Sequence, residues 1–261
     1  MTRLALIELI KLATVRLTCG LLAAVAGISA LFSVLFEAAR TGAHAAPVST
    51  AAGLTRITTD TGFARLLAAV LGVTAASGEF RHGTATTTYL SCPRRGRVLA
   101  AKACAAAIAG AIFGITGGLV TTTAGLLFAA AAGGGHVALG PGTLAGHIAG
   151  AAAGAGLLAM AGVVLGSLVR GQLGAVIGVF VWAVILEPVV GGFFTSIRPY
   201  LPYTAATTLG GAKLTSAFFG AGTTAPGPGA LPFAAAAALV AGVAIALAAI
   251  SAAVTVPRDI T

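Results

Sequence analysis

The stretch ACAAAIAGAIFGITGGLVTTTAGLLFAAAA, at residues 103–132, contains no charged residue, and no Lys, Arg, Asp or Glu follows it until Arg170. A helix needs about 20 mostly apolar residues to cross the hydrocarbon core of a bilayer. Residues 103–169 are therefore long enough for two membrane spans. The segment GGGHVALGPGT at 133–143 predicts the turn between them, because polyglycine and Pro141 interrupt helices.

The composition of the whole chain points to the same solvent. Of its 261 residues, 58% are hydrophobic and only 8% are charged, whereas a soluble domain carries about a quarter charged residues. A water-soluble surface cannot be built from this sequence, so we predict an all-α membrane protein. The net charge of +9 does not indicate a nucleic-acid partner, because the basic residues are few and lie between hydrophobic spans. Membrane lipid with anionic headgroups, or an acidic protein surface, fits this charge better.

The apolar segments predict six transmembrane helices, at residues 17–36, 62–78, 103–132, 144–169, 172–190 and 231–255. An even number places both termini on one side. With cytoplasmic termini, ten of the 15 Lys and Arg residues face inward, in agreement with the positive-inside rule. Arg65, near one end of the second span, is expected to reach the interface with its long side chain. The triplet Ala-His-Ala at 43–45 resembles a signal-peptide cleavage site, but the apolar run before it is longer than usual, so we expect a true span.

A further pattern concerns helix packing. Small residues four apart let helix backbones approach closely in lipid, and glycines recur at this spacing on spans three and four, at Gly110, Gly114, Gly118, Gly146, Gly150, Gly154, Gly162 and Gly166. We expect them to pack within one bundle rather than to form a dimer face.

The segment GGFFTSIRPYLPYTAATTLGG at 191–211 predicts a re-entrant or interfacial element, with Tyr200 and Tyr203 at headgroup depth.

Charge is concentrated in GEFRHGTATTTYLSCPRRGRVLAAK, at 78–102. The order of residues in this predicted cytoplasmic loop resembles the first cytoplasmic loop of ABC-2 type transporter permeases, in the motif Glu79, Phe80, Arg81, His82, Gly83, Thr84, then Pro93, Arg94, Arg95 and finally Lys102. The N-terminal residues Glu8, Lys11 and Arg16 are similar to the family's E-x-x-K-L-x-x-x-R segment. The stretch from Trp182 to Glu187-Pro188 also resembles the family's fifth span.

This resemblance implies a single ABC-2 type transmembrane domain over residues 1–261, in the bacterial cytoplasmic membrane. The loop 79–102 would contain a coupling helix that docks on a separate ATPase, and residues 1–16 would form an amphipathic connecting helix. Two permease subunits, identical or related, would pair with an ATPase dimer that binds ATP and Mg²⁺. The chain itself would bind no cofactor and would form the path for export. The threonines at 84 and 86–88 are modest helix formers, which leaves the length of the coupling helix open.

Six spans also occur in intramembrane proteases, which carry recognisable catalytic motifs. There is no GxSG followed by a later histidine, no HExxH and no GxxxxGK[ST], so we predict that the chain is not an enzyme. The histidines are scattered and predict no metal site. The three cysteines lack a CxxC spacing and are expected to be small apolar side chains: Cys19, Cys92 and Cys104.

Two acidic residues invite specific hypotheses. Glu187 lies near the membrane core, so it either handles a proton or cationic substrate, or it is structural and caps a helix kinked at Pro188 or pairs with Arg198. We favour the structural role. Glu79 is expected to pair with Arg81 or with an N-terminal base such as Lys11, which would hold the loop against the bundle.

Other functions remain open at this point. A secondary transporter or channel without ATP should show charged residues deep in its spans, and often an internal repeat. The spans here are nearly free of ionisable residues and show no convincing repeat. A scaffold or sensor would need no coupling loop.

Overall fold

The computed structural model describes residues 2–40, 62–81, 83, 95–131, 141–169, 171–210 and 231–255. Across these residues every regular element is a helix, in agreement with the predicted all-α class. In chain order the elements are α1 (Thr2–Thr14), α2 (Arg16–Arg40), α4 (Phe63–Arg81), α6 (Arg95–Ala131), α7 (Pro141–Leu168), α8 (Gln172–Phe180), the π-helix η1 (Val181–Leu186), α9 (Glu187–Phe193), the 3-10 turn η2 (Arg198–Tyr200), α10 (Pro202–Leu209) and α11 (Phe233–Thr255).

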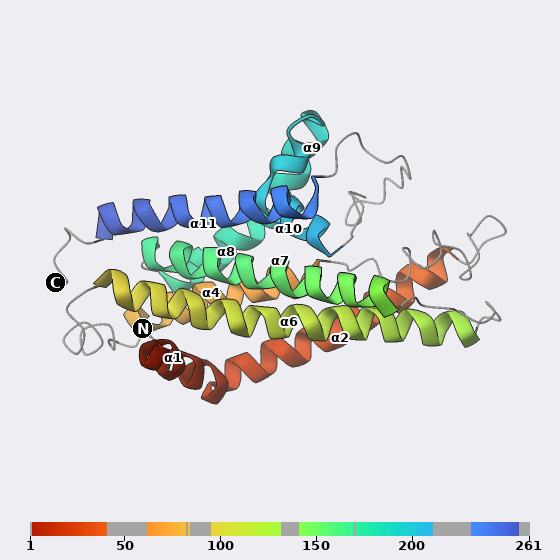
Figure 1. The fold of residues 1–261 in the computed structure, drawn as a ribbon, viewed down its shortest axis with the longest axis horizontal. Helices are drawn as coiled ribbons and strands as arrows, with labels where there is room; N and C mark the ends of the chain where they lie inside the picture. Colours follow the sequence, from red (N-terminus) through yellow and green to blue (C-terminus); the bar gives the residue numbers. More distant parts are fainter. Residues whose placement is uncertain are drawn as a thin grey trace.

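The long helices α2, α4, α6, α7 and α11 run side by side along the long axis of the molecule (Figure 1). Helix α1 and the C-terminal end of α11 lie at the same end of this bundle. Helix α8 continues through η1 into α9, which leaves the bundle at a steep angle, and α10 leads the chain back against α7 and α11.

Four helices in the described part of the chain are long and apolar enough to cross a membrane: Arg16–Ala38, Gly96–Ala131, Leu144–Leu168 and Gln172–Phe193. A shorter apolar helix covers Phe233–Ala249. These lengths support a multi-pass membrane protein. The full set of six spans and the side on which the termini lie stay predictions.

Two helices begin earlier than the sequence predicts. Helix α6 begins at Arg95 rather than at residue 103, so Lys102 lies inside the helix instead of at the end of a loop. Helix α7 begins at Pro141, within the segment for which the sequence predicts a turn. Proline suits the first helical position, because its missing N–H would have no partner there.

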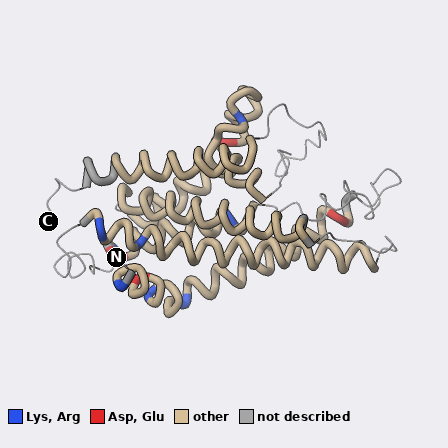
Figure 2. Tube along the Cα trace, in the orientation of Figure 1, with Lys and Arg blue, Asp and Glu red and all other residues tan. Residues whose placement is uncertain are grey.

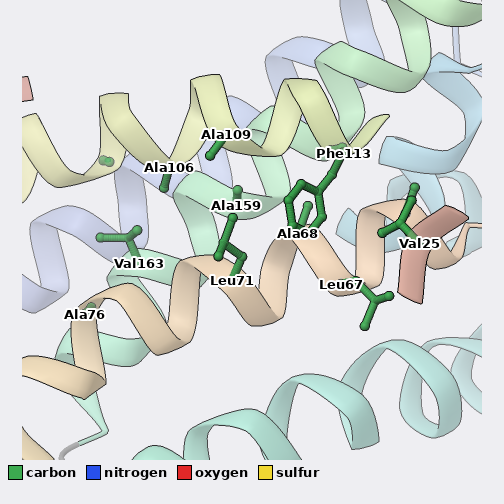
Figure 3. Packing of buried hydrophobic residues seen from close by; sticks show 13 residues of the cluster. Val25, Leu67, Ala68, Leu71, Ala76, Ala106, Ala109, Phe113, Ala159 and Val163 are labelled. Carbon is green, nitrogen blue, oxygen red and sulfur yellow. The ribbon is translucent and has the colours of Figure 1, made fainter. Parts of the chain in front are cut away.

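Helix α4 is enclosed by its neighbours and packs mainly against α7 and α6. All ten residues from 64 to 73 are buried. Figure 3 shows Ala68 and Leu71 of α4 beside Phe113 of α6 and Ala159 of α7, which belong to one apolar cluster. The prediction for Arg65 is wrong, because its side chain is fully buried in this helix and does not reach an interface.

Close backbone contacts explain the glycine spacing. A Cβ added to Gly114 of α6 would lie 2.6 Å from the carbonyl carbon of Ala151 on α7. A Cβ added to Gly162 of α7 would lie 3.1 Å from the backbone nitrogen of Val73 on α4. Packing within one bundle is therefore confirmed for Gly110, Gly114, Gly150, Gly154, Gly162 and Gly166, whereas an added Cβ at Gly146 meets nothing within 4 Å.

Alanine substitution should consequently have opposite signs at two helical glycines. Gly114→Ala forces α6 and α7 apart and should lower stability by about 1–3 kcal/mol. Gly20→Ala meets nothing within 4 Å and should stabilise α2 by roughly 0.5–1 kcal/mol, the usual advantage of alanine in a helix. Thermal unfolding of the two purified variants in detergent measures both effects, and shifts in the same direction would contradict the packing described here.

Candidate functional site

Four charged side chains from three helices meet at the end of the bundle where α1 lies. The Nζ atom of Lys102 on α6 is 2.5 Å from Oε2 of Glu8 on α1 and 2.9 Å from Oε1 of Glu79 on α4. Lys11 Nζ is 2.7 Å from Glu8 Oε1 and 3.6 Å from Glu79 Oε1. Figure 2 shows Lys and Arg gathered at this end, with long stretches of uncharged helix beyond. We call these four residues the charge network.

Burial makes one of the two lysines far more important than the other. The side chain of Lys102 is only 7% exposed, and those of Glu8 and Glu79 are 8% and 14% exposed, whereas that of Lys11 is 48% exposed. Two carboxylates and two ammonium groups balance in charge. A buried charge without a partner is costly, so Lys102 is what allows both acids to be buried.

The pKa values of the α1 residues follow from this geometry. Burial alone would raise the pKa of Glu8, but hydrogen bonds from Lys102 and Lys11 outweigh it and hold the pKa below the ordinary glutamate value. For Lys11, burial alone would lower the pKa, but the hydrogen bond and charge of Glu8, with the charge of Glu79, raise it. Both groups are therefore held in their charged forms.

The local sequence explains how each member reaches the network. Glu8 lies on the buried side of α1, and Lys11 follows one helical turn later. Glu79 comes in the last turn of α4, after its apolar run. Lys102 lies about two turns into α6, a position it can occupy only because this helix begins at Arg95. The network thus joins α1 to the two helices that flank residues 82–94.

The prediction that Glu79 pairs with an N-terminal base is confirmed by its contact with Lys11. The alternative partner, Arg81, instead donates from Nη1 to Oε1 of Gln172 at 3.2 Å, which joins α4 to α8. The closest partner of Glu79, Lys102, was singled out in the sequence only as the end of the motif. No local sequence signal could have indicated these pairs, because Lys102 is 23 positions from Glu79 and 94 positions from Glu8.

For the other described residues predicted to take part in coupling or in the connecting helix, the structure gives a position in the chain but no contact with the charge network. Gly83 follows α4 with a φ of 67°, the left-handed region that glycine tolerates. Phe80 lies in the last turn of α4, Arg95 begins α6, and Arg16 begins α2 with an exposed side chain. His82, Thr84, Pro93 and Arg94 lie outside the described residues, as does the predicted coupling helix.

Methionine substitutions of the two lysines separate buried from exposed pairing. Lys102→Met leaves two buried carboxylates without their shared partner and should cost about 3–5 kcal/mol of stability. Lys11→Met removes a half-exposed charge of the same length and should cost roughly 0–1 kcal/mol. Unfolding of both variants by thermal or SDS titration in mixed micelles gives the comparison. Equal losses of stability in the two variants would show that the burial of Lys102 does not strengthen its ion pairs.

Glu187 forms a second polar centre, 2% exposed, at the start of α9. Its Oε1 accepts hydrogen bonds from Trp182 Nε1 and from the backbone N–H of Tyr203, both at 2.8 Å. Its Oε2 accepts from the backbone N–H of Thr204 at 2.8 Å and from the Thr204 hydroxyl at 3.0 Å. Four donors therefore point at one carboxylate.

These contacts support the structural role for Glu187 over substrate handling. The two backbone donors belong to the first turn of α10, whose N–H groups have no intrahelical partners, so Glu187 caps α10 rather than the helix at Pro188. Arg198, the alternative predicted partner, is not among the four donors to Glu187. Its aliphatic stem packs against Gly191. The π-helix brings Trp182 under Glu187, because residues five apart align in its wider turns.

Replacement of the capping carboxylate should loosen α10, and the only tryptophan of the chain reports it. Glu187→Gln keeps the size but turns one acceptor into a donor that faces the N–H groups of α10. We expect a loss of about 1–3 kcal/mol and a shifted Trp182 emission maximum. Thr204→Val removes a single hydroxyl donor and serves as the milder control. An unchanged emission spectrum and unfolding temperature in Glu187→Gln would contradict the capping role.

Arg65 is a buried charge whose burial the sequence did not predict. Its guanidinium lies where α4, α7 and the end of α10 meet, and a Cβ added to Gly154 would be 2.8 Å from its Nε. A Cβ on Gly210 would collide with the same guanidinium. His147 Nδ1 lies 2.8 Å from the carbonyl oxygen of Gly210, and Tyr203 donates its hydroxyl to Gly62 O at 2.9 Å. Glycines on two elements thus make room for one arginine.

Groups of three or more His, Cys, Asp or Glu side chains that would suit a metal ion are not found in the described ranges. Cys19 and Cys104 are exposed on α2 and α6. No protein-family model matches the sequence, and no curated protein matches it either.

Proposed function

We propose that the chain is the membrane-spanning permease subunit of an ATP-binding cassette transporter of the ABC-2 type. A separate ATPase dimer supplies the energy, and a second permease subunit, identical or related, completes the export path. The observation that supports this proposal is the charge network, since Lys102 joins Glu8 and Glu79 at 2.5 and 2.9 Å. It fastens α1 to both helices that flank the segment resembling a coupling loop.

A docking loop needs a rigid attachment if it is to transmit force. A displacement of residues 82–94 would reach α4 through Glu79 and α6 through Lys102, and Glu8 would carry it to α1. Glycine contacts then couple these helices to the rest of the bundle, because α7 packs backbone to backbone on both α4 and α6. Closely packed helices shift as units rather than deform continuously. The three helices would therefore respond together when a bound ATPase closes.

The exposed face of α1 supports its role as a connecting helix at the membrane surface. Its apolar residues Leu6, Ile7 and Ile10 are each more than half exposed, while Glu8 is buried against the bundle. An amphipathic helix with such a face lies in the plane of the interface. Membrane lipid is therefore the proposed partner of this face, and the bacterial cytoplasmic membrane is the proposed location.

A second candidate function is a secondary transporter or channel that works without ATP. Two buried charges favour it, because Arg65 is fully buried in α4 and Glu37 is only 3% exposed on α2. Ionisable side chains within membrane helices often line transport paths. The two proposals differ in whether an ATPase binds the chain.

The proposal is tested by purifying the chain from its native membrane with an affinity tag and by identifying any ATPase that accompanies it. The Glu79→Gln variant should lose at least about tenfold in transport-coupled ATP hydrolysis, which corresponds to a barrier to transmission raised by roughly 1.4 kcal/mol. Arg3→Gln removes an exposed α1 charge outside the network and should retain the activity.

One result would overturn the proposal, and a second would overturn the role that it gives to the charge network. Purification of the intact chain without any ATPase would favour the secondary transporter or channel. Undiminished coupling and assembly in Glu79→Gln would show that the charge network has no part in transmission. Glu79→Asp, which keeps the charge, should recover part of the lost activity.

A further inference from the structure

Helix α2 turns an unusual face toward the bundle. Its buried side chains recur every four residues, at Val25, Ser29, Ser33 and Glu37, each at most 6% exposed. Large apolar side chains such as Leu31 and Leu35 lie on the outer side and are at least half exposed. Three of the four packed residues are therefore polar, while the face turned away from the bundle is apolar.

The facing residues of α6 are small or hydroxylated. The Ser33 hydroxyl donates to the backbone oxygen of Thr121 at 2.9 Å. One turn earlier on both helices, a Cβ added to Gly117 would lie 3.6 Å from Ser29 Oγ and 3.5 Å from Val25 Cγ1. The two helices thus pack in parallel register, and we call this line of contact the α2–α6 seam.

Two hydroxyls in the seam, Ser29 Oγ and Thr121 Oγ1, are buried and have no hydrogen-bond partner among the described residues. Ser29 is 0% and Thr121 is 1% exposed. A buried hydroxyl without a partner costs about 1–3 kcal/mol, and the usual solution in proteins is an internal water that joins such groups. The side chain of Thr122, which bonds Gly118 O at 2.8 Å, shows that a neighbouring threonine satisfies itself on its own helix.

The seam has a polar end and an apolar end. Glu37 lies two turns beyond Ser29, roughly 12 Å along α2 at 1.5 Å per residue. In the other direction, Val25 at 0% and Phe113 at 1% exposure belong to the apolar core cluster. Water that enters at the Glu37 end would meet hydroxyls as far as Ser29 and would stop at Val25 and Phe113.

We propose that the α2–α6 seam is a water-binding vestibule, entered from the Glu37 end and closed by Val25 and Phe113. Water molecules bridge the Ser29 and Thr121 hydroxyls and continue past Ser33 toward Glu37. Helix α2 is well suited to form its outer wall, because only 17% of the residues in its most apolar stretch are buried inside the protein. The vestibule does not depend on whether an ATPase drives the protein.

Cysteine accessibility tests the vestibule in the full chain in membrane vesicles. In a background with Cys19, Cys92 and Cys104 replaced by alanine, single variants Ser33→Cys, Ser29→Cys, Val25→Cys and Leu31→Cys are exposed to a membrane-impermeant cationic methanethiosulfonate. Only a thiolate in contact with water reacts. We expect Ser33→Cys and Ser29→Cys to react at least about tenfold faster than Leu31→Cys, with Val25→Cys as slow as Leu31→Cys.

A second measurement needs no labelling. Thr121→Val keeps the side-chain shape and removes the hydroxyl. In a hydrated seam this variant loses a hydrogen bond to water, so its unfolding temperature should fall. In a dry seam it removes an unsatisfied group, and its unfolding temperature should rise.

The proposal is overturned if Ser33→Cys and Ser29→Cys react no faster than Leu31→Cys, or if Thr121→Val raises the unfolding temperature. Rapid reaction of Val25→Cys would also overturn it, because the seam would then be open past its apolar end. Loss of ATPase coupling in other variants changes none of these readouts, so failure here is distinct from failure of the proposed transport function.

Discussion

The ammonium group of Lys102, held between the carboxylates of Glu8 and Glu79, is the interaction on which the arrangement of this end of the molecule depends. The three groups lie on α6, α1 and α4, and they can be buried only together, because an unpartnered charge in this position would cost several kcal/mol. Lys11 adds a weaker contact at the exposed edge. The network fixes an amphipathic helix across the ends of two helices whose other buried contacts are mainly apolar.

Away from the network, stability depends on close approach rather than on large side chains. Helix α7 contacts α4 at Gly162 and Gly166, α6 at Gly156, and α10 at Gly150. Without a hydrophobic driving force between helices in lipid, such backbone packing and internal hydrogen bonds hold a bundle together. Glu187 serves the same purpose at the return of the chain, where it caps α10 and ties it to the π-helical turn at Trp182.

Hydropathy and glycine spacing predicted the helical class, the positions of the long helices and packing within one bundle, because these properties are local and periodic. The pairing of Glu8 with Lys102 was not predicted, since the two residues are 94 positions apart and only the fold brings them together. Arg65 was expected to reach the interface because it lies near one end of a predicted span. Hydropathy carries no information about neighbouring helices, and here glycines on other elements enclose the guanidinium. The four hydrogen bonds of Glu187 support the structural role that was favoured for it, but its donors on α10 follow no sequence rule. Glu37 was passed over as a residue beyond a span end, although the spacing of Val25, Ser29 and Ser33 continues to it.

A double-mutant cycle between Glu8→Gln and Lys102→Met tests the central claim most directly. The free energy of unfolding is measured for the parent chain, both single variants and the double variant under one set of conditions. If the network joins α1 to α6, the double variant should be more stable than the sum of the single losses predicts, by a coupling energy of about 1–3 kcal/mol. Losses that add to within about 0.5 kcal/mol would show that the two groups act independently and would contradict the account.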